Sequence, residues 1–139
     1  MKKLIIPLSF ICLCFGKTPR YGDEQIAVLI NEYFKTTPSA PMLLGHSFYE
    51  EKGERIFQID IEGKDANIRN ELLFGFSAMS QFANVSKTKF RQFILIIHFE
   101  NHVVPVVAKS DIACLKSFFI DQTIDELNWR KKCLNIKEM

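Results

Sequence analysis

The side chains of this chain that could do chemistry are a serine in a glycine-led pentapeptide, three histidines and a few carboxylates. The pentapeptide runs from Gly45 to Tyr49 and places Ser47 where a nucleophile elbow has its serine. That motif needs a second glycine to make the sharp turn from strand to helix, and Tyr49 stands in its place. We therefore expect Ser47 to be an ordinary strand residue.

The histidines are His46, His98 and His102, and imidazole is a favoured zinc ligand. Their spacing matches no recurrent ligand pattern. His98 lies between Ile97 and Phe99 in an apolar run, which favours a core or interface histidine over a metal ligand. The sequence therefore predicts neither a metal nor another cofactor.

Three carboxylates, Asp60, Glu62 and Asp65, follow one another near the end of an alternating run. One of them could serve acid–base catalysis if a cleft removed it from water. A solvated strand edge and a helix cap explain the same residues without catalysis. We expect a non-enzymatic protein, and the alternative is a small enzyme whose groups converge only in three dimensions.

The first sixteen residues have the pattern of a secretory signal peptide. Lys2 and Lys3 precede an apolar run over residues 4–15, and Gly16 ends it. This run of roughly a dozen residues is too short to span a bilayer, which takes about 20. We expect residues 1–16 to be removed after Gly16.

Removal of the leader would leave a flexible lead over residues 17–22 and a single domain over residues 23–139. Such a protein would be periplasmic or secreted. The alternative is lipoprotein processing at Cys12 or Cys14, which would anchor the protein to the membrane through a lipid.

Charge excludes one class of partner. The chain has 18 basic and 16 acidic residues, and loss of Lys2 and Lys3 with the leader would leave 16 of each sign. A nucleic-acid binder needs a basic surface to neutralise phosphates, so we expect none here. Lys87, Lys89 and Arg91 form a local basic cluster, which we interpret as the solvated start of a strand.

The elements that position these residues centre on residues 90–108, where β-branched and aromatic residues predict two strands. The break at Glu100 and Asn101 is too short for a crossover helix, so the strands should pair antiparallel. Pro105 cannot donate to a ladder, which places the second strand at the sheet edge or at a bulge. The strand that follows Phe90 then lies further inside the sheet.

A second hairpin is predicted over residues 42–62, because two strand-like runs flank a charged turn that contains Gly53. Apolar spacing and caps predict four helices, which cover residues 23–34, 65–83, 110–119 and 123–134. Gly75 inside the long helix indicates a close contact. The predicted order is helix, two strands, helix, two strands, two helices, an α+β domain with a mainly antiparallel four-stranded sheet of two hairpins covered by helices.

The strand after Phe90 is apolar on both faces, although only one can lie against the long helix. Ile94, Ile96 and His98 share the other face and make a candidate interaction face. We expect a protein or another component of the bacterial cell envelope to bind there, and a second copy of the chain would serve as well. A carrier with an apolar pocket between sheet and helix is a further alternative.

Cys114 and Cys133 are predicted to form a disulfide. If Cys12 and Cys14 leave with the leader, the exported domain keeps an even pair in an oxidising compartment. The short link around Asp121 lets the last two helices fold back on each other and bring the sulfurs together. The alternative is two unrelated buried cysteines that serve as small apolar residues.

Overall fold

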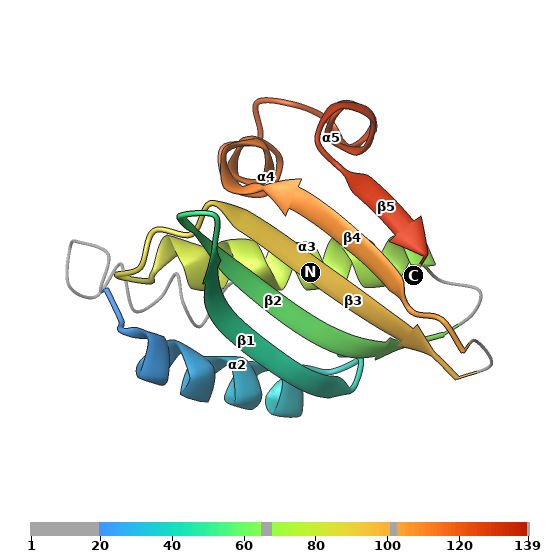
Figure 1. Cartoon of the computed structure of the whole chain (residues 1–139). Helices are drawn as coiled ribbons and strands as arrows, with labels where there is room; N and C mark the ends of the chain where they lie inside the picture. Colours follow the sequence, from blue (N-terminus) through green and yellow to red (C-terminus); the bar gives the residue numbers. More distant parts are fainter. Residues whose placement is uncertain (1–19, 65–67, 101–102, 139) are drawn as a thin grey trace.

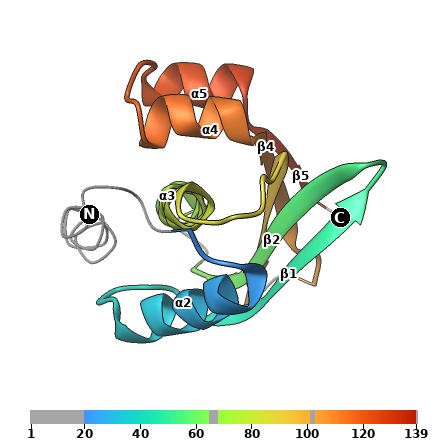
Figure 2. The same ribbon diagram turned by 90° about the vertical axis from the view of Figure 1, so that its left-hand side faces the viewer.

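The computed structural model describes residues 20–64, 68–100 and 103–138. Its elements, in chain order, are α2 (Asp23–Thr36), β1 (Leu43–Glu51), β2 (Glu54–Gly63), α3 (Ile68–Asn84), β3 (Gln92–Phe99), β4 (Val106–Asp111), α4 (Ile112–Phe119), α5 (Glu126–Lys132) and β5 (Asn135–Glu138). The strands form one five-stranded sheet in the order β1-β2-β3-β4-β5, and the described helices lie on one side of it (Figures 1 and 2).

The sheet is mixed, because β2 and β3 run parallel while the other neighbouring strands run antiparallel. The cause is α3, which returns the chain from the end of β2 to the level where β2 began (Figure 1). The predicted α+β class and the element order as far as α5 are confirmed. The sheet is mainly antiparallel, as predicted, but it has five strands where four were predicted, and its two hairpins join through a parallel pair.

Both predicted hairpins are present. Lys52 and Gly53 have φ values of 52° and 80°, which make the two-residue turn whose twist suits antiparallel strands. In the second hairpin β3 lies at the centre of the sheet, as predicted, but β4 lies between β3 and β5 and not at an edge. Pro105 precedes the first residue of β4, so it removes no donor from the ladder.

The last two helices begin at aspartate caps. The side chains of Asp111 and Asp125 each accept the backbone N–H three residues on, at 2.8 Å. Because Asp125 is the cap, α5 begins at Glu126, and the predicted start at Thr123 was wrong. The helix ends at Lys132 and the chain then pairs with β4, where a continued helix was predicted.

The core lies between the sheet and the helices. Its fully buried side chains from β2, α3 and β3 include Phe57, Ile59, Ile61, Leu72, Phe76, Phe93, Leu95 and Ile97. Gly75 of α3 passes so close to β3 that a Cβ there would lie 2.5 Å from Leu95 Cδ2. The predicted close contact at Gly75 and the predicted cover of β3 by this helix are therefore confirmed.

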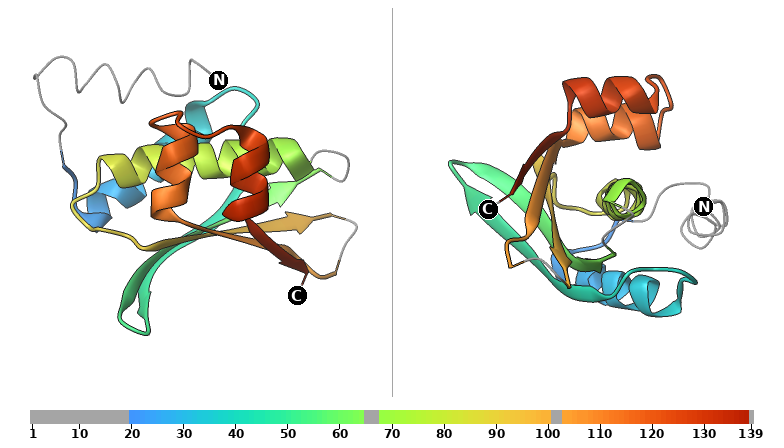
Figure 3. Two further views of the ribbon diagram at one scale, coloured as in Figure 1. Left: turned by 90° about the horizontal axis from the view of Figure 1, so that it is seen from above. Right: turned by 90° about the vertical axis from the view of Figure 1, so that its right-hand side faces the viewer.

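The α4 and α5 helices lie side by side and form a small C-terminal unit (Figures 2 and 3). Trp129 is fully buried in it, with its ring 5.3 Å from Phe118 and 5.6 Å from Phe76 of α3. The Cα atoms of Cys114 and Cys133 lie 5.9 Å apart and the sulfurs are at bonding distance. The predicted pair is thus placed as a disulfide requires.

The predicted leader, Cys12, Cys14 and the helix cap Asp65 lie outside the described residues. Within the described ranges, no helix combines the length and the apolar character needed to cross a membrane.

Candidate functional site

The candidate functional site is the sheet surface that points away from α3, which we call the outer face. Side chains alternate along a strand, so Phe57, Leu95 and Ile97 pack toward α3 while their neighbours point outward. Figures 2 and 3 show no described helix over this surface. The residues that strand register places on it include Ser47, Tyr49, Ile56, Gln58, Asp60, Glu62, Ile94, Ile96, His98, Val107, Lys109 and Lys137.

A chain of polar contacts crosses the outer face from β1 to β3. The Tyr49 hydroxyl donates to Gln58 Oε1 at 3.0 Å, and Gln58 Nε2 donates to Asp60 Oδ1 at 2.9 Å. The second oxygen of Asp60 lies 3.1 Å from His98 Nε2. Since a carboxylate only accepts, Nε2 carries the proton in this contact. Four half-buried side chains therefore hold one another in place.

Burial and charge keep the Tyr49 hydroxyl protonated. Removal of its ring from water raises the pKa of Tyr49, and the nearby carboxylates of Glu51 and Asp60 raise it further. The hydroxyl therefore remains a donor at neutral pH, which is the role it has toward Gln58.

An apolar cluster lies beside this polar chain. Ile56, Ile94 and Val107 are buried against one another, and Tyr49 and Ile96 pack against them. Of the two apolar residues in the predicted interaction face, Ile94 is 6% exposed, so its neighbours within the chain already cover it. Ile96 is half-buried and keeps accessible surface, so the apolar centre of the outer face is small.

Charges flank the apolar cluster on both sides. Asp60 and Glu62 lie on β2, while Lys109 on β4 and the exposed Lys137 on β5 lie beyond β3. Across the strands the outer face therefore changes from acidic, through the apolar position of Ile96, to basic.

Ser47 and His98 do not lie close together on the outer face. Ser47 is an exposed residue of β1 in register with Gln58, as expected of an ordinary strand residue. Two strand spacings and four residues separate it from His98, which is about 16 Å. Ser47 therefore lies too far away for His98 to activate it.

The other predicted site residues do not join this surface. His46 of β1 is in register with Ile59 and its ring lies 5.7 Å from that of Phe48, so it points to the helix side of the sheet. His102 and Asp65 lie outside the described residues. In the part of the chain that the structure describes, no three His, Cys, Asp or Glu side chains come together as a metal site.

Sequence reasoning identified Asp60 and His98 separately but not their contact, and it missed Tyr49 and Gln58. The missing step was the parallel pairing of β2 with β3, which sets Asp60 opposite Ile96 and next to His98. One signal was present in the sequence, since Gln58 and Asp60 are two residues apart and therefore share a strand face.

Comparison of the chain with models of known protein families, with curated proteins and with solved structures finds no match. The function proposed below therefore has its basis in the chain's own residues.

Proposed function

We propose that this protein is an exported, non-enzymatic domain that binds a partner protein through the outer face. The observation that carries the proposal is the arrangement around Ile96, an accessible apolar side chain between the carboxylates of β2 and the lysines of β4 and β5. Protein interfaces commonly have such an apolar centre within a polar rim.

The dimensions of the sheet favour a modest interface. Five strands of 4 to 10 residues, spaced by about 4.8 Å and rising about 3.3 Å per residue, give a surface of roughly 600 Å². That area is at the low end for protein complexes and is typical of a reversible contact.

The charge pattern specifies the chemistry of the partner. Asp60 and Glu62 favour a Lys or Arg side chain on one side of an apolar residue, and Lys109 favours a carboxylate on the other. Because these charges are half-exposed or exposed, they contribute more to the orientation and rate of binding than to affinity.

The polar chain supports binding by fixing side chains before the partner arrives. Tyr49, Gln58, Asp60 and His98 each have a contact within the chain, so little conformational freedom is lost on association. Pre-organised polar groups beside an apolar centre are what a selective surface needs.

Export is the second part of the proposal. The leader pattern of residues 1–16 and the bonding distance between Cys114 and Cys133 both favour an oxidising compartment outside the cytoplasm. A periplasmic or secreted location follows, with lipid anchoring at Cys12 or Cys14 as the alternative.

The test compares two matched substitutions in a pull-down from envelope extract. Ile96→Lys places a charge in the centre of the outer face, and Val28→Lys places the same charge on α2, where the side chain is 63% exposed. Circular dichroism first establishes that both variants fold. We expect one captured protein to be lost with Ile96→Lys and kept with Val28→Lys, and its capture to weaken as salt rises.

Two results would overturn this proposal. Equal capture by both variants would remove the role of the outer face. A protein that forms dimers in sedimentation, with the dimer abolished by Ile96→Lys, would make a second copy of the chain the occupant in place of a different partner.

A second candidate function, a small enzyme, is favoured by the contact between Asp60 and His98. A carboxylate that orients a histidine is the arrangement of many general bases. Ester and phosphoester substrates test this candidate: turnover that His98→Asn abolishes and Ile96→Lys preserves would decide for catalysis.

A further inference from the structure

A hollow of about 730 Å³ is lined by the connection from α3 to β3 and by residues of α4, away from the outer face. We call it the basic groove, and its lining residues are Arg20, Ala83, Ser86, Lys87, Thr88, Lys89, Phe90, Ile112, Ala113 and Lys116. The lining therefore has four cations, two hydroxyls, an apolar remainder and no carboxylate.

The cations come from three separate segments of the chain. Arg20 precedes α2, Lys87 and Lys89 lie between α3 and β3, and Lys116 lies on α4. None of these four takes part in an ion pair among the described residues. Without its leader the chain would have equal numbers of basic and acidic residues, so this grouping is a local excess of positive charge.

Two carboxylates next to lining residues already have partners. Asp23 accepts from the Thr88 hydroxyl at 2.6 Å and pairs with Arg55 at 3.1 Å. Asp111 accepts the Cys114 N–H at 2.8 Å as the cap of α4. Neither lines the basic groove, so the described part of the chain places no carboxylate in its lining.

A simpler role explains one of the four cations. The Arg20 guanidinium donates to the backbone oxygen of Asn84 at 2.9 Å, where a cation complements the C-terminal end of α3. Lys87 and Lys89 lie beyond that end, and none of the three lysines makes a side-chain hydrogen bond with another described residue. Three ammonium groups therefore remain available for an external anion.

We propose that the basic groove binds a phosphate group attached to a partly apolar molecule. The lysines supply charge, and Lys is a common partner of phosphate oxygens. Ser86 is 4% exposed and its oxygen accepts the Thr88 N–H at 3.1 Å, which leaves its O–H as a donor into the groove. Phe90 and Ile112 provide the apolar lining. An anionic lipid headgroup and a soluble organic phosphate both have this chemistry.

Two probes separate these sources. Inorganic pyrophosphate, measured by calorimetry, represents a soluble phosphate. Vesicles of phosphatidylglycerol in phosphatidylcholine, measured by co-sedimentation against pure phosphatidylcholine, represent a lipid headgroup. Binding to the anionic vesicles alone assigns a lipid, and binding to pyrophosphate without the vesicles assigns a soluble phosphate.

Two triple variants with the same change in net charge locate the site. The first is Lys87→Gln with Lys89→Gln and Lys116→Gln, and the control is Lys35→Gln with Lys64→Gln and Lys131→Gln, all exposed positions outside the groove. We expect the first triple to weaken binding by about tenfold and the control by less than about twofold. Unfolding curves establish that both variants fold.

Failure to bind either probe would overturn the assignment, and so would an equal loss with both triples, because that would indicate diffuse attraction to net charge. Capture of a partner by the outer face is a separate measurement, so either site can fail without the other.

Discussion

At the scale of single residues, two tyrosines differ in what their hydroxyls contact. The Tyr49 hydroxyl donates to Gln58 on the outer face. The Tyr33 ring lies among phenylalanines of α2 and α3, and its buried hydroxyl has no hydrogen-bond partner among the described residues. Burial raises the pKa of Tyr33 well above its ordinary value, so the hydroxyl stays neutral.

The same substitution should therefore have opposite effects at the two positions. Tyr49→Phe removes a hydrogen bond and should lower the free energy of unfolding by about 1 kcal/mol. Tyr33→Phe removes an unpaired buried hydroxyl and should raise the free energy of unfolding by up to about 1 kcal/mol. Urea unfolding of both variants measures this, and destabilisation by Tyr33→Phe would show that the hydroxyl has a partner.

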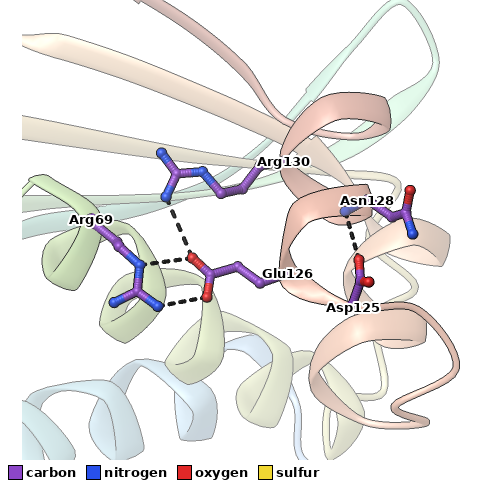
Figure 4. Close-up of polar contacts among 5 residues, drawn as sticks. All are labelled: Arg69, Asp125, Glu126, Asn128 and Arg130. Carbon is purple, nitrogen blue, oxygen red and sulfur yellow. Dashed lines mark hydrogen bonds and ion pairs between the residues drawn. The ribbon is translucent and has the colours of Figure 1, made fainter.

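An ion pair lowers the pKa of Glu126. Arg69 donates to its two oxygens at 2.9 and 2.6 Å, and Arg130 lies 3.4 Å away (Figure 4). The hydrogen bonds from Arg69 are the main cause that lowers the pKa of Glu126 in the folded chain. These contacts join the first turns of α3 and α5.

Because the pKa of Glu126 is lower in the folded chain than in the unfolded chain, the free energy of unfolding that this pair contributes depends on pH. The pair stabilises the fold above the unfolded value of 4.5, and this contribution is lost as pH falls through the lower folded pKa. Glu126→Gln should lower the free energy of unfolding by about 0.5 kcal/mol at pH 7, since the pair is partly exposed. Urea unfolding at several pH values should show the difference from the wild type shrink below pH 4.5. A constant difference at all pH values would assign the effect to packing.

At the scale of elements, much of the fold was predictable from the sequence. Alternating residues and the turn at Gly53 predicted the first hairpin, and the apolar run after Phe90 predicted the central strand. The parallel pair could have been inferred, because a long helix between two hairpins brings the chain back to its starting level. The β5 strand could not be inferred from the sequence, since its four residues are mostly polar and become a strand only by pairing with β4.

The candidate site was predictable only in part, for a related reason. A strand pattern tells which residues share a face, so Ile94, Ile96 and His98 were grouped correctly. It does not tell which strand is the neighbour, so the contact of His98 with Asp60 required the sheet order. Sites that assemble from several strands leave no short motif in the sequence.

The packing of α3 on β3 depends on Gly75. A Cβ there would lie 2.5 and 2.8 Å from the two terminal carbons of the fully buried Leu95. Gly75→Ala should gain about 1 kcal/mol of helix propensity and lose more through overpacking, with a net destabilisation of about 1 kcal/mol. In a chain that already has Leu95→Val, Gly75→Ala should leave the free energy of unfolding unchanged or raise it. Urea unfolding of the single and double variants measures this.

Gly45→Ala is the control, because an added Cβ there meets nothing within 4 Å. If Gly75→Ala has the same effect with Leu95 and with Leu95→Val, the two residues are not coupled and the close approach is not what limits the helix.

The pair Cys114 and Cys133 closes a loop across α4 and α5 with a sequence separation of 19. A bridge of this span should stabilise the domain by about 3 kcal/mol in the chain-entropy model. We expect reduction, or Cys114→Ala with Cys133→Ala, to lower the melting temperature. Exported protein whose two thiols are alkylated without prior reduction would contradict both the bridge and the export proposal.

At the scale of the whole molecule, the layered fold separates two surfaces. All described helices lie on one side of the sheet, which leaves the outer face open (Figure 3). The basic groove lies elsewhere, between the α3–β3 connection and α4. The two proposed ligands, a protein at the sheet and a phosphate at the groove, would therefore not compete with each other.

The most direct test of the proposed function is photo-crosslinking in cells that produce the protein. A photoreactive amino acid replaces Ile96 in one variant and Val28 of α2 in a matched control. Binding through the outer face predicts a discrete adduct with another protein from position 96 and none from position 28. No adduct from position 96, the same adducts from both positions, or an adduct made only of two copies of this chain would contradict it.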